Sequence, residues 1–260
     1  MTINVERCIM ACGSARAGTT PITTALERSG VLGWLSSEFF NPYWEQGPCN
    51  RGSYCFWREY LDYALRKGTT TNGVFGWKQH GEYLQYLLAR LRLIDPSFVG
   101  LDDLALLQNS FPGLDPSTSF IYIWRRDILA QAVSRLIAET SGTWTSVSPT
   151  IREPEFIKDL AKNNYWQVIN EHAAWQNWFR LYGVRPICLN YEEVMADPGS
   201  EFSRVFEHVG IVCPAAAVLR PTCRRQRTSL NSGWIKYLHK ILEDEVFAFG
   251  FPQELEPPFV

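Results

Sequence analysis

Apolar residues gather along this chain in short, nearly continuous runs that are separated by longer segments of helical periodicity. Short apolar runs are typical of strands that are buried on both faces of a sheet. The runs predict strands at residues 8–12, 31–35, 73–80, 119–124 and 185–191. Strands that alternate with helices, without a repeat or linker between them, are typical of an α/β domain with a mostly parallel sheet. The sequence therefore predicts one α/β domain over residues 1–260.

The helices are predicted from apolar residues that recur every three to four positions and so share one face. Residues 42–58 are rich in Pro, Gly, Asn and aromatic residues and predict an irregular loop that could cover a site. The periodicity predicts helices near residues 20–29, 54–65, 83–93, 128–137, 163–182, 197–209 and 234–247, with a short helix within 98–107.

Composition narrows the classes of function. The chain has 260 residues, 46% of them hydrophobic, and a net charge of −2. It can therefore bury a large core, and it has no basic field to attract nucleic acid. Its seven cysteines lack zinc-ligand spacing, and we expect no metal. With no signal peptide and no apolar run of about 18 residues to span a bilayer, we expect a cytoplasmic protein that contacts no membrane.

The first predicted strand leads into a glycine-bounded loop and then a helix. The loop runs from Gly13 to Gly18, and we expect Thr20 to cap the helix with Pro21 at its first position. In such a unit the loop N–H groups and the positive end of the helix dipole point at one place, which suits a phosphate or a similar anion. A glycine loop alone is a weak signal, because a tight turn without a ligand has the same composition.

The loop has the spacing of a nucleotide-binding P-loop, but Thr19 stands where that motif has a lysine. In ATPases and kinases the lysine reaches the β- and γ-phosphates, so its absence argues against those activities. The cation of this loop is Arg16, whose guanidinium offers a planar set of donors to phosphate or sulfate oxygens.

Glu38 lies just past the run at 31–35 and beside Phe39 and Phe40. Ligands gather outside the carboxyl ends of strands in open parallel sheets. Flanking aromatic rings could desolvate the carboxylate and raise its pKa, which would make Glu38 a base. A helix-capping glutamate is the alternative.

Lys78 and His80 end the predicted strand at 73–80. Side chains two residues apart on a strand point the same way, so these two could face one cleft. A lone histidine is more often structural, but its place beside a lysine at a strand end favours a role in a site.

A second unit of strand and helix carries two arginines. Arg125 and Arg126 directly follow the run at 119–124, and the next helix carries Ser134. Charges at the end of a buried strand are costly unless they meet an anion or a carboxylate. A salt bridge to Asp127 is one alternative. We expect anion binding, because the first loop predicts a phosphate at the same edge.

Together these motifs resemble those of sulfotransferases that use 3′-phosphoadenosine 5′-phosphosulfate (PAPS). The family's 5′-phosphosulfate loop usually reads Pro-Arg-Ser-Gly-Ser/Thr-Thr, whereas residues 15–20 here read Ala-Arg-Ala-Gly-Thr-Thr. The family's 3′-phosphate motif is an arginine after a buried strand and a serine eight residues later, and Arg126 and Ser134 keep this spacing. Cytosolic members add an Arg-Lys-Gly segment and a later tryptophan, whose places are taken here by Arg227, Thr228, Ser229 and Trp234.

Within the sulfotransferases, the likeness is greatest to the bacterial trehalose sulfotransferase family, over about residues 9 to 240. It implies a P-loop-like, mostly parallel sheet flanked by helices, and transfer of a sulfuryl group from PAPS to a hydroxyl or amine of a small molecule such as a sugar or a specialised metabolite. No metal is needed, and the chain could form a homodimer. The blocks that carry the likeness are residues 38–40, 73–78, 126–127, 131–134 and 142–144.

The resemblance also implies roles for particular residues. The donor would be bound at its 5′ end by Arg16, Ala17, Gly18, Thr19 and Thr20, and at its 3′ end by Arg126, Ser134, Arg227, Thr228 and Ser229. The proposed base of the trehalose family maps to Glu38, and that of the cytosolic enzymes maps to His80. Both candidates stay open, and we favour Glu38. Arg16 and Lys78 would offset the charge that grows on the leaving phosphate.

Two other functions are compatible with the same fold. One is a nucleotide kinase or NTPase, against which the missing P-loop lysine argues. The other is a non-catalytic nucleotide-binding module.

Overall fold

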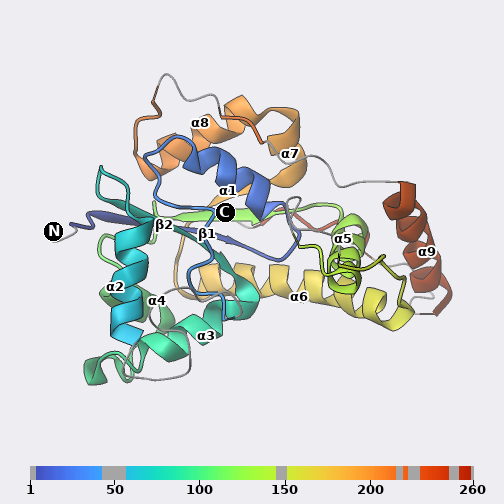
Figure 1. Ribbon diagram of the computed structural model, residues 1–260, viewed down its shortest axis with the longest axis horizontal. Helices are drawn as coiled ribbons and strands as arrows, with labels where there is room; N and C mark the ends of the chain where they lie inside the picture. The colour runs from blue at the N-terminus through green and yellow to red at the C-terminus, as the bar shows by residue number, and fades with distance from the viewer. Residues whose placement is uncertain are drawn as a thin grey trace.

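The computed structural model describes residues 4–42, 57–144, 151–214, 219–221, 229–245 and 252–258. Within these ranges a sheet forms in the order β2-β1-β3-β4, and every neighbouring pair of strands is parallel. The carboxyl ends of the strands therefore share one edge, and β1 lies between β2 and β3 (Figure 1). The predicted α/β class with a parallel sheet is confirmed. The strands are β1 (Arg7–Gly13), β2 (Val74–His80), β3 (Phe120–Trp124) and β4 (Ile187–Asn190).

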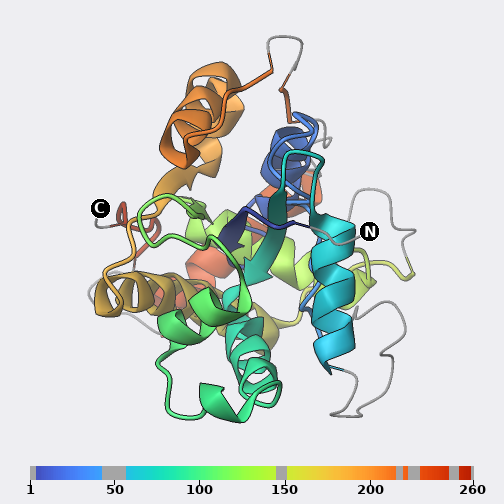
Figure 2. The ribbon, with the colours of Figure 1, turned by 90° about the vertical axis from the view of Figure 1, so that its left-hand side faces the viewer.

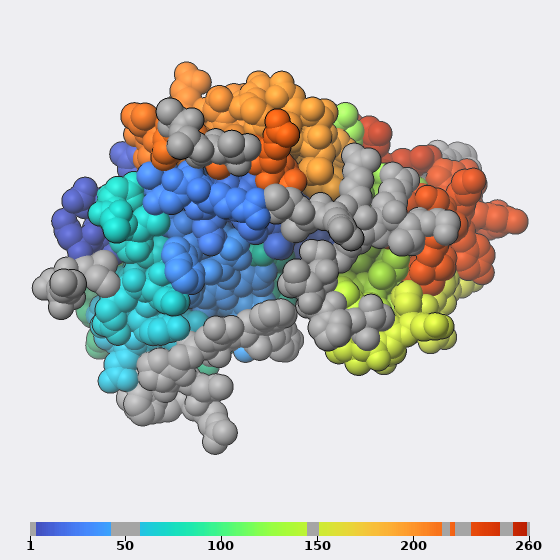
Figure 3. All heavy atoms as spheres, turned by 45° about the horizontal axis from the view of Figure 1, so that its top comes forward, coloured from blue at the N-terminus to red at the C-terminus, as the bar shows by residue number. Residues whose placement is uncertain are grey.

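Helices cover both faces of this sheet. Helices α1, α7 and α8 lie over one face and α2, α3, α4 and α6 over the other, while α5 and α9 lie together at one side (Figures 1 and 2). Figure 3 shows α1 and the segment after it (blue) at the surface, between α2 (cyan) and α8 (orange). The helices are α1 (Thr19–Glu27), α2 (Trp57–Gly68), α3 (Gly81–Leu91), α4 (Asp103–Ser110), α5 (Ile128–Ser141), α6 (Lys158–Leu181), α7 (Tyr191–Ala196), α8 (Pro198–Val209) and α9 (Ser229–Glu245), with a 3-10 turn at Pro96–Phe98.

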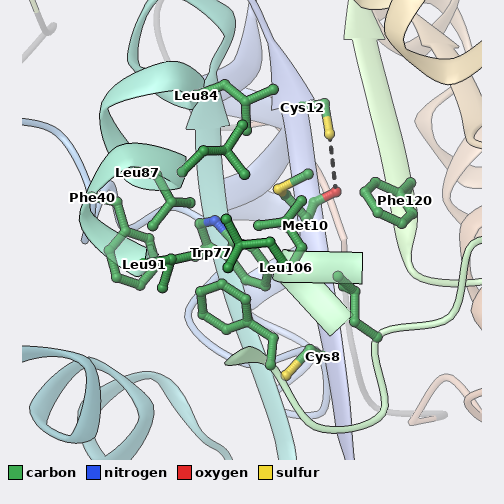
Figure 4. Close-up of a cluster of buried hydrophobic side chains, with 14 of the residues drawn as sticks. Cys8, Met10, Cys12, Phe40, Trp77, Leu84, Leu87, Leu91, Leu106 and Phe120 are labelled. Atoms are coloured by element: carbon green, nitrogen blue, oxygen red, sulfur yellow. Dashed lines mark hydrogen bonds between the residues drawn. The ribbon is translucent and has the colours of Figure 1, made fainter. Parts of the chain in front are cut away.

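Alternate residues of β1 face two different cores, because successive side chains of a strand point to opposite sides. Met10 and Cys12 pack with the helices on the α3 side, around Trp77 of β2 (Figure 4). Ile9 and Ala11 pack with α1 and α8 on the other side. A third cluster joins α5, α6 and α9. The continuous apolar runs are therefore strands that are buried on both faces, as their pattern predicts.

The run at 31–35 is not a strand, contrary to the prediction. Its backbone crosses β2 where two glycines meet, and a Cβ on Gly33 would lie 2.0 Å from the nitrogen of Gly76. The carbonyl of Ser37 then accepts a hydrogen bond from a β2 backbone N–H at 2.9 Å. This close crossing, rather than sheet pairing, brings the next residue, Glu38, to the end of β2.

Two other features of the local structure differ from the predictions. Helix α1 begins at Thr19, and its N-cap is Gly18 with a left-handed φ of 90°, so Thr20 does not cap it. Helix α7 directly follows β4 and was not predicted. Most of the predicted 42–58 loop lies outside the described residues. No helix in the described part of the chain combines the length and the apolar character needed to span a bilayer.

Gly33→Ala should destabilise the fold more than Gly30→Ala. Both glycines have a φ of 72°, so both variants carry the left-handed backbone penalty of about 1–2 kcal/mol. Only at position 33 would the new methyl group meet backbone, since nothing lies within 4 Å of a Cβ on Gly30. We expect Gly33→Ala to lower the free energy of unfolding by about 2 kcal/mol more than Gly30→Ala, measured by urea titration. Equal losses would show that the crossing relaxes without strain.

Candidate active site

The loop between β1 and α1 is tightly packed at the carboxyl edge of the sheet. A Cβ on Gly13 would lie 2.6 Å from the side chain of Thr19, and a Cβ on Gly18 would lie 2.1 Å from the ring of Tyr191. Arg16 and Gly18 have left-handed φ angles of 64° and 90°. These residues turn the chain so that α1 begins at the edge, and no described side chain caps it. The backbone N–H groups at such a start can bind an anion.

Arg16 joins the two predicted anion-binding units. Its Nε donates a hydrogen bond to Oγ of Ser134 at 2.9 Å, and its Nη1 donates to the carbonyl of Trp144. Ser134 lies on α5, in the unit that follows β3. The fold thus brings two residues that are 118 positions apart into direct contact.

Lys78 carries a buried charge beside this loop. Its side chain is 3% exposed, and its Nζ lies 2.8 Å from Oε1 of Glu38. The same Nζ donates a hydrogen bond to Oγ1 of Thr20, in the first turn of α1, at 3.0 Å. Asn41 donates a second hydrogen bond to Glu38 at 2.6 Å. Three segments of the chain therefore meet around one ion pair.

Glu38 is ionised in this arrangement. Burial raises the pKa of its carboxyl group, but the positive charge of Lys78, the nearby His80 and two hydrogen bonds outweigh burial and lower the pKa to about 2. The expectation of a raised pKa is therefore wrong. Burial acts as expected, but the opposite charge outweighs it. Phe39 and Phe40 pack with the core around β2.

His80 lies beside the ion pair, with its Nε2 3.6 Å from Oε1 of Glu38. Its ring stacks on Tyr83, with centroids 6.2 Å apart. Burial lowers the pKa of His80, Glu38 raises it, and the charges of Lys78 and Arg135 lower it again, to about 4. The imidazole is therefore neutral at pH 7. Its buried Nε2 has no hydrogen-bond partner among the described residues.

Arg126 lies at the same edge, after β3. Its partner is Glu193, and not Asp127 as the sequence suggested as an alternative. Its Nη2 lies 2.8 Å from Oε1 of Glu193, and its backbone N–H donates to Glu192 at 3.0 Å. Asp127 instead caps α5 by accepting a hydrogen bond from the N–H of Ala130 at 2.8 Å. The side chain of Arg126 is 40% exposed, so an anion from solution can reach it.

The structure describes only some of the remaining predicted donor-binding residues. Ala17 and Thr19 are buried, and Ala17 can offer an anion only its backbone groups. Arg227 and Thr228 lie outside the described residues. Ser229 begins α9, and its side chain is not among those described.

Two residues that hold the loop were missed in the sequence. Nε1 of Trp175, on α6, donates a hydrogen bond to the carbonyl of Gly13 at 3.1 Å. The aromatic pattern of this helix predicts core packing, and nothing in it marks one indole for the loop. Tyr191 begins α7 directly after β4 and lies against Gly18. Its place after a strand, at the edge where the other candidates gather, is the signal that could have identified it.

A parallel sheet whose carboxyl edge carries an uncapped helix start, the Arg16 loop and Arg126 defines an α/β protein with the sulfotransferase fold. Residues 8–240 match the family model described as Stf0 sulphotransferase, which is the bacterial trehalose sulfotransferase family. The chain belongs to this family and is a sulfotransferase. This confirms the resemblance predicted from the motifs. No curated protein sequence matched the chain.

Glu38→Gln should destabilise the protein in a pH-dependent way. The pKa of Glu38 is about 2 in the folded protein against an ordinary value of 4.5. The carboxylate therefore stabilises the fold above pH 4.5, and this contribution is lost as the pH falls from 4.5 towards 2. We expect the variant to lose about 3 kcal/mol of unfolding free energy at pH 7.

The difference between the two proteins should shrink below pH 4.5, as measured by urea titrations at several pH values between 3 and 7. A difference that does not change with pH would contradict the low pKa of Glu38.

Proposed function

We propose that the enzyme transfers the sulfuryl group of PAPS to a hydroxyl or amine of a small molecule, such as a sugar or a specialised metabolite, and releases 3′,5′-ADP. The observation that carries the proposal is the 2.9 Å contact between Arg16 and Ser134. It joins a loop suited to a 5′-phosphosulfate with an arginine-and-serine unit suited to a 3′-phosphate. PAPS carries an anionic group at both of these ends, whereas all the phosphates of ATP are at one end.

The residues at the edge fit such a donor in charge and access. The uncapped start of α1 and the guanidinium of Arg16 suit the 5′ end. At the 3′ end, Arg126 is 40% exposed and Glu193 is 54% exposed. An exposed ion pair is worth about 0–1 kcal/mol, so a phosphate can replace Glu193 and gain charge-assisted hydrogen bonds. We expect the sites to be completed by Ala17, Gly18, Thr19 and Thr20 at one end and by Ser134, Arg227, Thr228 and Ser229 at the other.

In the proposed reaction the acceptor oxygen or nitrogen forms a bond to sulfur. The bond between sulfur and the bridging oxygen of the 5′-phosphate breaks, and that oxygen keeps the electron pair. The acceptor proton passes to a base. Little covalent work falls to the protein in such a transfer, so positioning and charge stabilisation dominate. Arg16 and Lys78 would stabilise the negative charge that grows on the leaving phosphate.

Glu38 is the proposed base, and His80 is its neighbour at 3.6 Å. The charge of Lys78 is the largest of the effects that hold the pKa of Glu38 low against the effect of burial. An anionic donor beside Lys78 would balance that charge and draw its Nζ towards the leaving phosphate. Burial would then dominate, and the carboxylate would become more basic once the donor is bound.

The proposal places the reaction in the cytoplasm and requires no metal, membrane or nucleic acid. Assembly into a homodimer stays a prediction. The aromatic loop that could contact the acceptor lies mostly outside the described residues.

The protein should bind 3′,5′-ADP more tightly than ATP with Mg²⁺. Arg126→Ala should weaken the binding of 3′,5′-ADP far more than the binding of 5′-AMP. Charge-assisted contacts to a 3′-phosphate are worth roughly 1.5–3 kcal/mol, or about 10- to 150-fold in affinity. Titration calorimetry measures these affinities.

Incubation with PAPS and candidate acceptors, followed by mass spectrometry, detects the gain of one sulfate.

Arg204→Ala is a matched control, because Arg204 also forms an ion pair, with Glu201 at 2.7 Å, and is 50% exposed. It should leave both affinities unchanged. Tighter binding of ATP than of 3′,5′-ADP would overturn the proposed donor and favour a nucleotide kinase. Donor binding without any sulfated product would favour a non-catalytic binding module.

Glu38→Gln should lower kcat by about 100-fold or more and leave 3′,5′-ADP binding intact, because glutamine keeps the shape but not the basicity. His80→Ala should lower kcat less. Steady-state kinetics at saturating PAPS, with calorimetry on both variants, compares them. The opposite ranking, with both variants folded and binding 3′,5′-ADP normally, would assign the base to His80.

A further inference from the structure

Gln131 is a buried polar residue for which the proposed reaction has no role. It lies on α5, and its side chain is directed at the anion-binding loop. The residue is 1% exposed, and its Nε2 donates hydrogen bonds to Oγ of Ser14 at 2.8 Å and to the carbonyl of Ala15 at 2.9 Å. A carbonyl can only accept, so the bond to Ala15 requires the amide nitrogen at this position.

The same face of α5 contacts the loop a second time. Gln131 and Ser134 are three residues apart and therefore lie on one side of the helix. Ser134 accepts the hydrogen bond from Nε of Arg16 at 2.9 Å. Three consecutive loop residues, Ser14, Ala15 and Arg16, are thus tied to one helix face.

The loop needs support of this kind from outside. Arg16 has a φ of 64°, a backbone region that residues other than glycine rarely adopt and that persists only where the surroundings enforce it. The side chains of Ala15 and Ala17 can form no hydrogen bond, and alanine at position 15 does not fix φ as a proline would. Hydrogen bonds from a neighbouring helix can hold the shape that the loop's own residues leave open.

The oxygen of the Gln131 amide gives a second reason to infer that its nitrogen serves to hold the loop. Its Oε1 is buried and has no hydrogen-bond partner among the described residues. A buried acceptor without a partner weakens a fold, and an apolar side chain of similar size would avoid that loss. The two donated hydrogen bonds to the loop are what the amide supplies and an apolar residue would not.

We propose that Gln131 is a positioning residue that holds the Gly13–Gly18 loop in its anion-binding shape, and so determines affinity for the 5′ end of the donor. This inference rests on the proposed function, because it takes the loop as the site of the 5′-phosphosulfate. Gln131 acts through Ser14 and Ala15 and does not itself contact the donor.

The test uses Gln131→Met, which keeps the length and volume of the side chain and removes both donors. Calorimetry compares three probes: 3′,5′-ADP, 5′-AMP and 3′-AMP. We expect the variant to bind 3′,5′-ADP and 5′-AMP about tenfold more weakly and to bind 3′-AMP as the parent protein does. Ser110→Ala is the control, since it also removes a buried side-chain hydrogen bond, to Leu106 on α4, and should change none of the three affinities.

Ser14→Ala is a second, smaller change in case Gln131→Met fails to fold. It removes one of the two acceptors and should weaken only the probes with a 5′-phosphate, by about threefold. In the double variant it should add less than it does alone, because its partner is already gone.

The outcomes separate the two hypotheses. A parent protein that binds 3′,5′-ADP no better than ATP would overturn the proposed function. If the parent binds as expected, then an equal loss for all three probes, or no loss for any, would overturn the role of Gln131 alone. Loss confined to the probes with a 5′-phosphate, in either single variant, supports it.

Discussion

The rest of the site depends on the buried ammonium group of Lys78. A charge that is 3% exposed would be destabilising by several kcal/mol if it had no partner. Its partners are Glu38 at 2.8 Å and the hydroxyl of Thr20 at 3.0 Å. Each of the three residues comes from a different segment, so β2, the first turn of α1 and the segment that crosses β2 must meet at one point. The charge thereby sets the geometry of this edge as well as its electrostatics.

The same charge shifts the proton affinity of both candidate bases. Glu38 is ionised because Lys78, together with His80 and the hydrogen bond from Asn41, outweighs the effect of burial on its pKa, and His80 is neutral chiefly because of its own burial. The two residues lie 3.6 Å apart, so a change in the charge of one shifts the pKa of the other. Proton affinity at this edge is therefore a property of the cluster. An anion beside Lys78 changes it for both residues at once.

Features with a local signal were predictable from the sequence, and features that depend on a distant contact were not. The runs that form β1 and β3 have the pattern of strands buried on both faces. The run at 31–35 has the same pattern, but its backbone crosses β2 at the close contact of Gly33 with Gly76. No local feature of the sequence indicates this contact. Likewise, Glu38 could be found from its place after an apolar run. Its low pKa comes chiefly from Lys78, whose closeness only the fold reveals.

Helix α5 connects the two proposed anion-binding units. Motif spacing predicts that Arg126 and Ser134 flank or lie on this helix, but not which of its residues face the loop. In the structure, Gln131 and Ser134 bind the loop from one face of α5, and Arg126 precedes its first turn. The groups proposed to bind the two ends of the donor are therefore attached to the same helix. Because α5 is tied to three consecutive loop residues, its packing would fix the distance between the two proposed anion sites. Selectivity for a donor with anionic groups at both ends would then arise from this spacing as much as from the charges themselves.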